Sequence, residues 1–304
     1  MKFALLANFT SLRSNFMSEG HFILRKQYFI PCKSPIIKKT TKEDIPMLKA
    51  AFFDIDGTLL SHKTNTVPPS TLRALEALRE KGILTFIATG RHIPEYRKLR
   101  PMADLRFDGI ISLNGQYCCN DEGVIYHCPI DPGDITTLLR YLEENPHPCI
   151  LVEEEQMYIN FHNALVEQVQ AAIHSEMPTL GDLNRGYSHP IYQAILYMSN
   201  EDLEKLPQMP HIKLTRWNMG GADLIPATGG KAAGIAKVLE YYGIDKSETI
   251  AFGDGENDVD MFSAVGISVA MGNACQAAKE AASHVTDDVD EDGIRNALVR
   301  LGIL

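Results

Sequence analysis

Two short apolar runs with a helix between them constrain the fold of this chain more than any other feature. Residues 50–55 form a short, mainly apolar run, and residues 83–91 form a second that ends in Thr89-Gly90-Arg91. Such runs are typical of strands buried on both faces. Leucines at three-residue spacing between the runs indicate a helix, with Ser70 as a candidate N-cap and Gly82 as a candidate stop. A strand–helix–strand unit predicts a parallel sheet with a right-handed crossover.

This pattern is interrupted within the chain and then returns. Residues 115–225 combine a hairpin signal around Gly123 with further short strands and helices, which indicates an α+β domain. Parallel strand–helix alternation resumes after Pro226. The sequence therefore predicts an α/β protein. Its doubly wound parallel sheet core comprises residues 47–114 and 226–304, and an α+β domain is inserted at residues 115–225.

Composition limits the classes of partner. The chain has 304 residues, 45% of them hydrophobic, and a formal net charge of −10, so it can bury a sizeable core. No basic tract with interleaved aromatics occurs, and no apolar stretch approaches the ~18 residues of a membrane span. We therefore expect neither a nucleic-acid nor a membrane partner. The six cysteines lack C-x-x-C spacing, which indicates reduced thiols and a cytoplasmic protein. Neither composition nor pattern predicts an oligomeric state.

The first 46 residues differ in charge from the rest. They carry eight Lys/Arg and three Asp/Glu residues, and they contain no convincing apolar period. One interpretation is an upstream extension of the reading frame, non-native or disordered, with the domain starting at Met47. The other is a basic arm that binds a partner. The pattern favours the first interpretation.

Polar residues gather where predicted core strands end. They occupy residues 54–58, 89–91 and 253–258, and Lys231 begins a helix in the returning half. Because the carboxyl ends of parallel strands border one crevice, we expect these residues to lie close together.

The residue types in this crevice indicate phosphoryl transfer. Asp54 and Asp56 face the same way in an extended chain, and like charges so close need a cation. Asp254 and Asp258 would add two carboxylates, and a site of oxygen donors suits Mg²⁺. Donors for an anion come from Thr89, a nearby backbone N–H and Lys231. A metal, anion donors and a carboxylate nucleophile together are typical of phosphoryl transfer to an aspartate.

Four motifs in this order resemble those of a known superfamily. "DIDGTL", "ATGR", a lone lysine at 231 and "GDGENDVDM" are similar to the motifs of haloacid dehalogenase (HAD) superfamily phosphatases. The insert resembles a type-IIB cap, and "SLNG" and "EDG" resemble the Cof-type subfamily. The resemblance covers residues 47–304 and implies a Rossmann-like core, a Mg²⁺ cofactor and a small phosphate ester as substrate. The basic N-terminus departs from it.

The resemblance also implies a role for each motif residue. Asp54 would be the nucleophile, Asp56 the general acid/base, and Lys231 the cation that bridges nucleophile and phosphate. The remaining assignments are phosphate or substrate contacts (Thr89, Gly90, Arg91, Asn257), metal ligands (Asp54, Asp254 and the backbone carbonyl of Asp56) and supporting residues (Thr58, Asp258). For Arg91, a salt bridge is an alternative to a substrate contact.

The sequence therefore predicts a Mg²⁺-dependent phosphatase that hydrolyses a small phosphorylated metabolite through an aspartyl-phosphate. A sugar phosphate is the favoured substrate class, by resemblance, and the insert is expected to select the substrate. Two alternatives stay open: a phosphomutase-type phosphotransferase, and a non-catalytic sugar-phosphate binding protein.

Overall fold

The computed structural model describes residues 47–102, 105–172, 176–216 and 220–304. The basic segment 1–46 lies outside the described residues, so the expectation about it stays a prediction.

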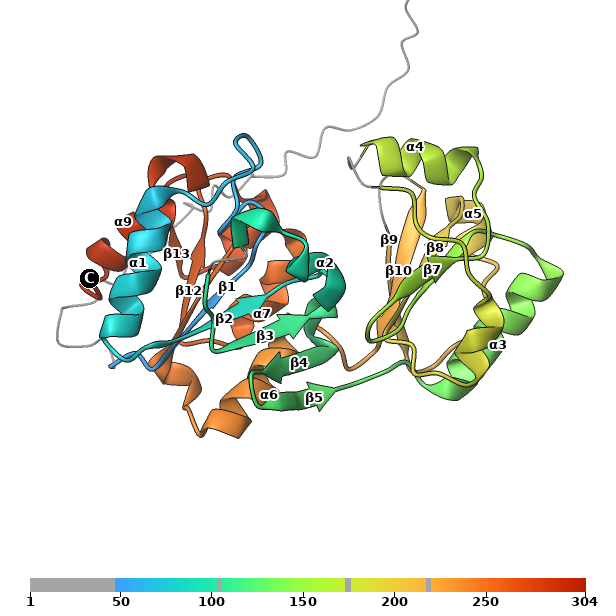
Figure 1. Ribbon diagram of the computed structural model, residues 1–304, viewed down its shortest axis with the longest axis horizontal. Coiled ribbons are helices and arrows are strands. Elements are labelled where there is room, and N and C mark those ends of the chain that lie inside the picture. Colours follow the sequence, from blue (N-terminus) through green and yellow to red (C-terminus); the bar gives the residue numbers. More distant parts are fainter. Residues whose placement is uncertain (1–46, 103–104, 173–175, 217–219) are drawn as a thin grey trace, which may run out of the picture. The chain divides into compact units, whose positions relative to one another are not determined.

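The core is built on a sheet of eight strands in the order β13-β12-β11-β1-β2-β3-β4-β5 (Figure 1). Their bounds are β1 Ala50–Phe53, β2 Leu84–Ala88, β3 Gly109–Ser112, β4 Tyr117–Asn120, β5 Gly123–His127, β11 Thr249–Gly253, β12 Ile267–Ala270 and β13 His284–Val285. The six strands from β13 to β3 pair in parallel. The order reverses at β1, which pairs with both β2 and β11. This confirms the doubly wound core and places its switch point at β1.

Helices pack around this sheet. They are α1 Pro69–Glu80, α2 Ile93–Arg97, α6 Lys231–Tyr242, α7 Val259–Ser263, α8 Gln276–Ala281 and α9 Gly293–Arg300. Helix α1 packs against α9, and α6 packs against α7. The expected N-cap of α1 is wrong. The helix begins at Pro69, whose fixed φ suits a first turn, and Ser70 is buried inside it.

The expected start of the insert at residue 115 also differs from the structure. Strands β4 and β5 form the predicted hairpin, but β4 pairs antiparallel with β3 and extends the core sheet. The inserted domain has its own antiparallel sheet in the order β7-β6-β8-β10-β9. Its elements are α3 Pro132–Glu144, β6 Cys149–Val152, β7 Met157–Ile159, α4 Ala164–Ala172, β8 Gln193–Tyr197, α5 Asn200–Leu203, β9 Ile212–Arg216 and β10 Gly221–Pro226. We call this domain the cap.

The two faces of the cap sheet have different neighbours because side chains alternate along each strand. One face packs with α3 residues such as Leu138 in one apolar cluster. The other face, which carries Ile195 and Tyr197, forms a second cluster with α4 and with core residues, among them Leu113 and Tyr117. Apolar contacts thus join the second cap face to the core.

One cap loop adds polar contacts to the core. The His92 Nε2–H group donates to the carbonyl of Glu154 over 2.7 Å, and the Tyr117 hydroxyl donates to the Glu154 carboxylate. Arg97 of α2 pairs with Glu155 at 3.0 Å. His92 and Arg97 follow the predicted motif residue Arg91 closely, so this loop docks beside the site.

Candidate active site

Lys231 lies at the centre of a buried ion cluster. Its side chain is fully buried, and its Nζ donates to Oδ1 of Asp54 and to Oδ1 of Asp258, both at 2.6 Å. The second oxygen of Asp258 accepts from the backbone N–H groups of Asp254 and Gly255 at 2.8 Å. Asp258 therefore fixes the turn after β11 and shares the lysine with Asp54.

Asp254 is held by contacts to the turn after β1. The Thr58 hydroxyl donates to its Oδ1 at 3.0 Å. Asn273 Nδ2 contacts the other oxygen at 3.4 Å and the carbonyl of Gly57 at 2.8 Å. Gly57 has φ +83°, and a Cβ there would lie 2.2 Å from Asp254 Oδ2. A glycine is therefore required at 57, both for its backbone conformation and for space.

The cluster has more negative than positive charge. One carboxylate oxygen each from Asp54, Asp254 and Asp258 lie within 4.8 Å of one another, and Lys231 is the cation bonded to two of these groups. Burial raises the pKa of Asp54 above its ordinary value, with a further rise from Asp258, although Lys231 opposes it. Burial likewise raises the pKa of Asp254 to about 6. With all three acids ionised the formal charge is −2, which one divalent cation would neutralise.

Asp56 and Arg91 form a two-point ion pair. Arg91 Nε donates to Oδ2 and a terminal nitrogen donates to Oδ1, both at 2.7 Å, and each side chain is about one-third exposed. Arg91 thus forms a salt bridge with Asp56, the expected acid/base, which agrees with the alternative given for Arg91. Arg91 also lines the cavity of the site. Its role as a substrate contact stays a prediction.

The other predicted residues line one cavity of about 450 Å³ with Asp54, Asp56 and Asp254. They are Thr89, Gly90, Arg91 and Asn257. Thr89 Oγ1 accepts the N–H of Arg91 at 3.1 Å, so its own proton is free to be donated. The structure thus brings the residues of the first, second and fourth motifs to one cavity, with Lys231 buried behind Asp54.

Two site residues were missed in the sequence. Asn114 accepts from Asn257 Nδ2 at 3.1 Å and lines the cavity, with φ +53°. It lies in "SLNG", a segment that resembles the Cof-type subfamily but does not by itself indicate a role. Asn273 follows β12 by three residues. Its position beyond a strand end was the signal that could have identified it.

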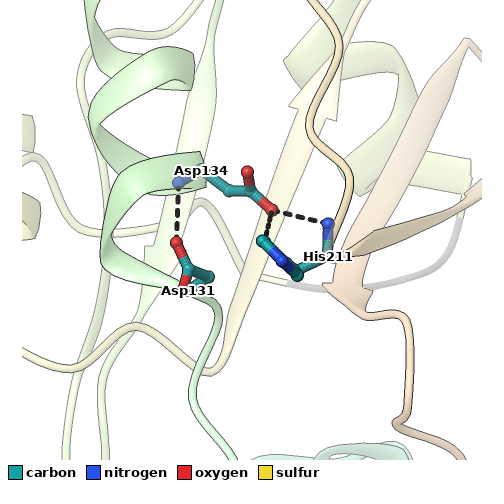
Figure 2. A group of neighbouring side chains, drawn as sticks. All are labelled: Asp131, Asp134 and His211. Carbon is teal, nitrogen blue, oxygen red and sulfur yellow. Dashed lines mark hydrogen bonds and ion pairs between the residues drawn. The ribbon is translucent and has the colours of Figure 1, made fainter.

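A second group of potential ligands lies in the cap. Asp131, Asp134 and His211 approach one another where α3 and β9 begin (Figure 2). Asp131 accepts the N–H groups of Gly133 and Asp134 as the N-cap of α3. Asp134 accepts the N–H of His211 at 2.9 Å. These bonds join α3 to β9, so the group has a structural explanation within the cap.

Comparison with known proteins identifies the family. A model of haloacid dehalogenase-like hydrolases matches residues 51–298. The chain belongs to this family. A Bacillus subtilis (strain 168) protein named "Putative phosphatase YkrA" is 36% identical over 258 residues, which cover 84% of this chain and 98% of that protein. The HAD family membership confirms the resemblance read from the four motifs.

Two further relatives of this HAD chain are informative. The structure of BT4131, described as a HAD subclass IIB sugar phosphatase, is 35% identical with a TM-score of 0.73, covering 84% of this chain and 100% of that one. A B. subtilis (strain 168) 5-amino-6-(5-phospho-D-ribitylamino)uracil phosphatase, YitU, is 27% identical over 259 residues, covering 81% of this chain and 94% of that protein. These likenesses support a phosphoric monoester hydrolase with a subclass IIB cap. Among the described residues, no helix combines the length and apolarity needed to cross a membrane.

Proposed function

We propose that this protein is a Mg²⁺-dependent phosphatase that hydrolyses a small phosphorylated metabolite through an aspartyl-phosphate on Asp54. The observation that carries the proposal is the buried cluster of Asp54, Asp254, Asp258 and Lys231 beside a cavity lined with anion donors. A carboxylate that attacks a phosphate dianion must first be relieved of charge repulsion, and this arrangement supplies part of that relief.

The donor set fits a hard divalent cation. Both carboxylate oxygens of Asp258 are engaged by Lys231 and by backbone N–H groups, which leaves Asp54 and Asp254 to bind a metal. Oxygen ligands, negative excess charge and a phosphate to complete the shell favour Mg²⁺. We propose Asp54, Asp254 and the backbone carbonyl of Asp56 as its protein ligands. When bound, the ion would screen the charge between nucleophile and phosphate.

The chain's own groups would then divide the work. Asp54 attacks phosphorus while Lys231 holds its Oδ1 in place, and the Thr89 hydroxyl and the Gly90 N–H hold phosphate oxygens. Asp56 protonates the leaving oxygen as the ester P–O bond breaks. It next takes a proton from the water that attacks phosphorus, which breaks the bond to Asp54 and releases phosphate. General acid/base help of this kind contributes ~10²–10⁴-fold in rate. Arg91 orients the ionised Asp56 carboxylate, which is the form that takes a proton from water.

A sugar phosphate is the substrate class we favour. A cavity of about 450 Å³ is of the size that holds a small metabolite. The names of BT4131 and YitU refer to a sugar phosphate and to a phosphorylated ribityl chain, both with hydroxyl-rich alcohols. The cytoplasmic location expected from the sequence stays a prediction.

The test is a panel of phosphorylated metabolites incubated with the purified protein and either Mg²⁺ or excess chelator, with released phosphate as the readout. We expect release with Mg²⁺ only, and none from the Asp54→Asn variant. Full turnover in excess chelator would contradict the metal assignment. A sugar bisphosphate product in place of free phosphate would establish the phosphomutase alternative, and binding without turnover would establish the sensor.

A further inference from the structure

Gln193 is a buried cap residue with an unpaired side-chain oxygen. It begins β8, has 6% of its surface exposed and lines the catalytic cavity. Its Oε1 atom is buried and accepts no hydrogen bond from the part of the chain that the structure describes. Leaving a buried polar atom unpaired is destabilising, so a ligand that donates a hydrogen bond to this oxygen would be bound in preference to one that cannot.

Strand register places a second polar side chain beside Gln193. Asp223 of β10 lies opposite Ile195 of β8, and Gln193 is two residues before Ile195. Directly opposed residues and residues two apart point to the same face of a sheet. Gln193 and Asp223 therefore share the cap face that borders the cavity, and both line it together with Asp54.

The charged groups of the cavity restrict which ligand groups can bind next to Gln193 and Asp223. Besides the expected catalytic and metal-binding residues, its acidic lining consists of Asp223 and Glu95. Among the described lining residues the one cation is Arg91, and both arms of its guanidinium are committed to Asp56. Hydrogen-bond donors on a ligand would be accepted here, whereas a second phosphate or carboxylate would face the carboxylates of Asp223 and Glu95.

We propose that Gln193 and Asp223 form the subsite for the leaving alcohol. They select monophosphate esters whose alcohol carries hydroxyl or amine donors and no second anionic group. This inference rests on the proposed phosphatase function and adds the residues and the chemistry of selection. A site with buried polar groups discriminates strongly against an analogue that leaves them unpaired.

The first test replaces the amide without changing its size much. Gln193→Met is compared with wild type on sorbitol 6-phosphate, glucose 6-phosphate and phenyl phosphate, whose alcohol part has no donor. We expect wild type to prefer at least one hydroxylated ester over phenyl phosphate in kcat/KM. In Gln193→Met that preference should fall about tenfold, as expected for the loss of one hydrogen bond worth ~1.4 kcal/mol.

Gln170 offers a matched control. It is a cap glutamine with 6% exposure, its Oε1 also lacks a partner among the described residues, and its Nε2 donates to Tyr197 at 2.7 Å. It does not line the cavity. Gln170→Met should therefore keep the wild-type preference. An equal loss of preference in both variants would mean that the effect is structural and would overturn the inference.

The second test removes the charge of Asp223. Asp223→Asn should raise kcat/KM for fructose 1,6-bisphosphate relative to fructose 6-phosphate by about tenfold, because one carboxylate facing the second phosphate is lost. An unchanged preference in Gln193→Met, or an unchanged ratio in Asp223→Asn, would overturn the subsite. Wild type that hydrolyses none of the esters, phenyl phosphate included, would instead contradict the proposed function itself.

Discussion

Gly57→Ala tests the position of Asp254 without removing any functional group. Gly57 has φ +83°, and an added Cβ would lie 2.2 Å from Asp254 Oδ2, where ordinary contacts begin at 3.4 Å. The carboxylate must therefore move by about 1 Å, away from the place that Thr58 and Asn273 give it. A misplacement of about 1 Å at a reacting centre costs on the order of 10²-fold in rate.

The same substitution also strains the backbone, and Gly82→Ala isolates that effect. Gly82 follows α1 with φ +71°, and nothing lies within 4 Å of its added Cβ. An alanine with positive φ costs ~1–2 kcal/mol, so both variants should melt a few degrees below wild type. Only Gly57→Ala combines this strain with displacement of the proposed metal ligand.

The assay is kcat/KM as a function of Mg²⁺ concentration, with thermal unfolding measured alongside. We expect Gly57→Ala to lose about 10²-fold in kcat/KM and to need at least tenfold more Mg²⁺ for half-maximal activity. Gly82→Ala should match wild type in both quantities. If the two variants had the same metal dependence, Asp254 would not bind the metal from the position seen here, and the reasoning would be refuted.

Three further predictions follow from the ion pairs and the N-terminus. Glu153 accepts from Gln156, Tyr158 and Arg185, so Glu153→Gln should lower the free energy of unfolding by about 3 kcal/mol, measured by urea unfolding. Burial alone would raise the pKa of Glu153, but these partners lower it to about 2. The free energy of unfolding of wild type should therefore fall by this amount as pH decreases from about 4.5 to about 2, whereas that of Glu153→Gln should not. If both proteins showed the same dependence of unfolding free energy on pH, the contacts of Glu153 would not stabilise its ionised form. Lys231→Met leaves Asp54 and Asp258 without their shared cation, so it should lower the free energy of unfolding by about 3–5 kcal/mol and abolish turnover. A variant as stable as wild type would mean that the ion pairs of Lys231 with Asp54 and Asp258 do not stabilise the fold. A chain that starts at Met47 should keep the melting temperature and turnover of the full chain, and a large loss of either would show that residues 1–46 pack on the domain.

The core and the placing of its buried ion cluster could be predicted because their signals are local in the sequence. A parallel strand buried on both faces must be apolar throughout, so its end is marked by the first polar residues, as in Asp54 and Asp254. The end of such a strand also fixes which edge of the sheet its polar residues reach. That is why residues as far apart as Asp54 and Asp258 were correctly expected in one place.

The partners of these residues could not be predicted in the same way. The hairpin of β4 and β5 was recognised, but its turn residues do not tell which sheet the hairpin joins, and β4 pairs with β3. The Asp56–Arg91 pair and the support of Asp254 by Asn273 depend on side-chain directions across separate loops. The unpaired amide oxygen of Gln193 depends on the positions of its neighbours in the cap, which the sequence does not give.

The most direct test of the central claim is to stop turnover with acid and search for a phosphoryl group on the enzyme. Mass spectrometry of the peptide that contains Asp54 should show one added phosphoryl group in wild type. The Asp56→Asn variant should accumulate more of it, because the same residue is expected to activate the water that removes it. The Asp54→Asn variant should carry none and release no phosphate. Substrate-dependent phosphate release from Asp54→Asn, with no phosphorylated Asp54 in wild type, would contradict the covalent mechanism.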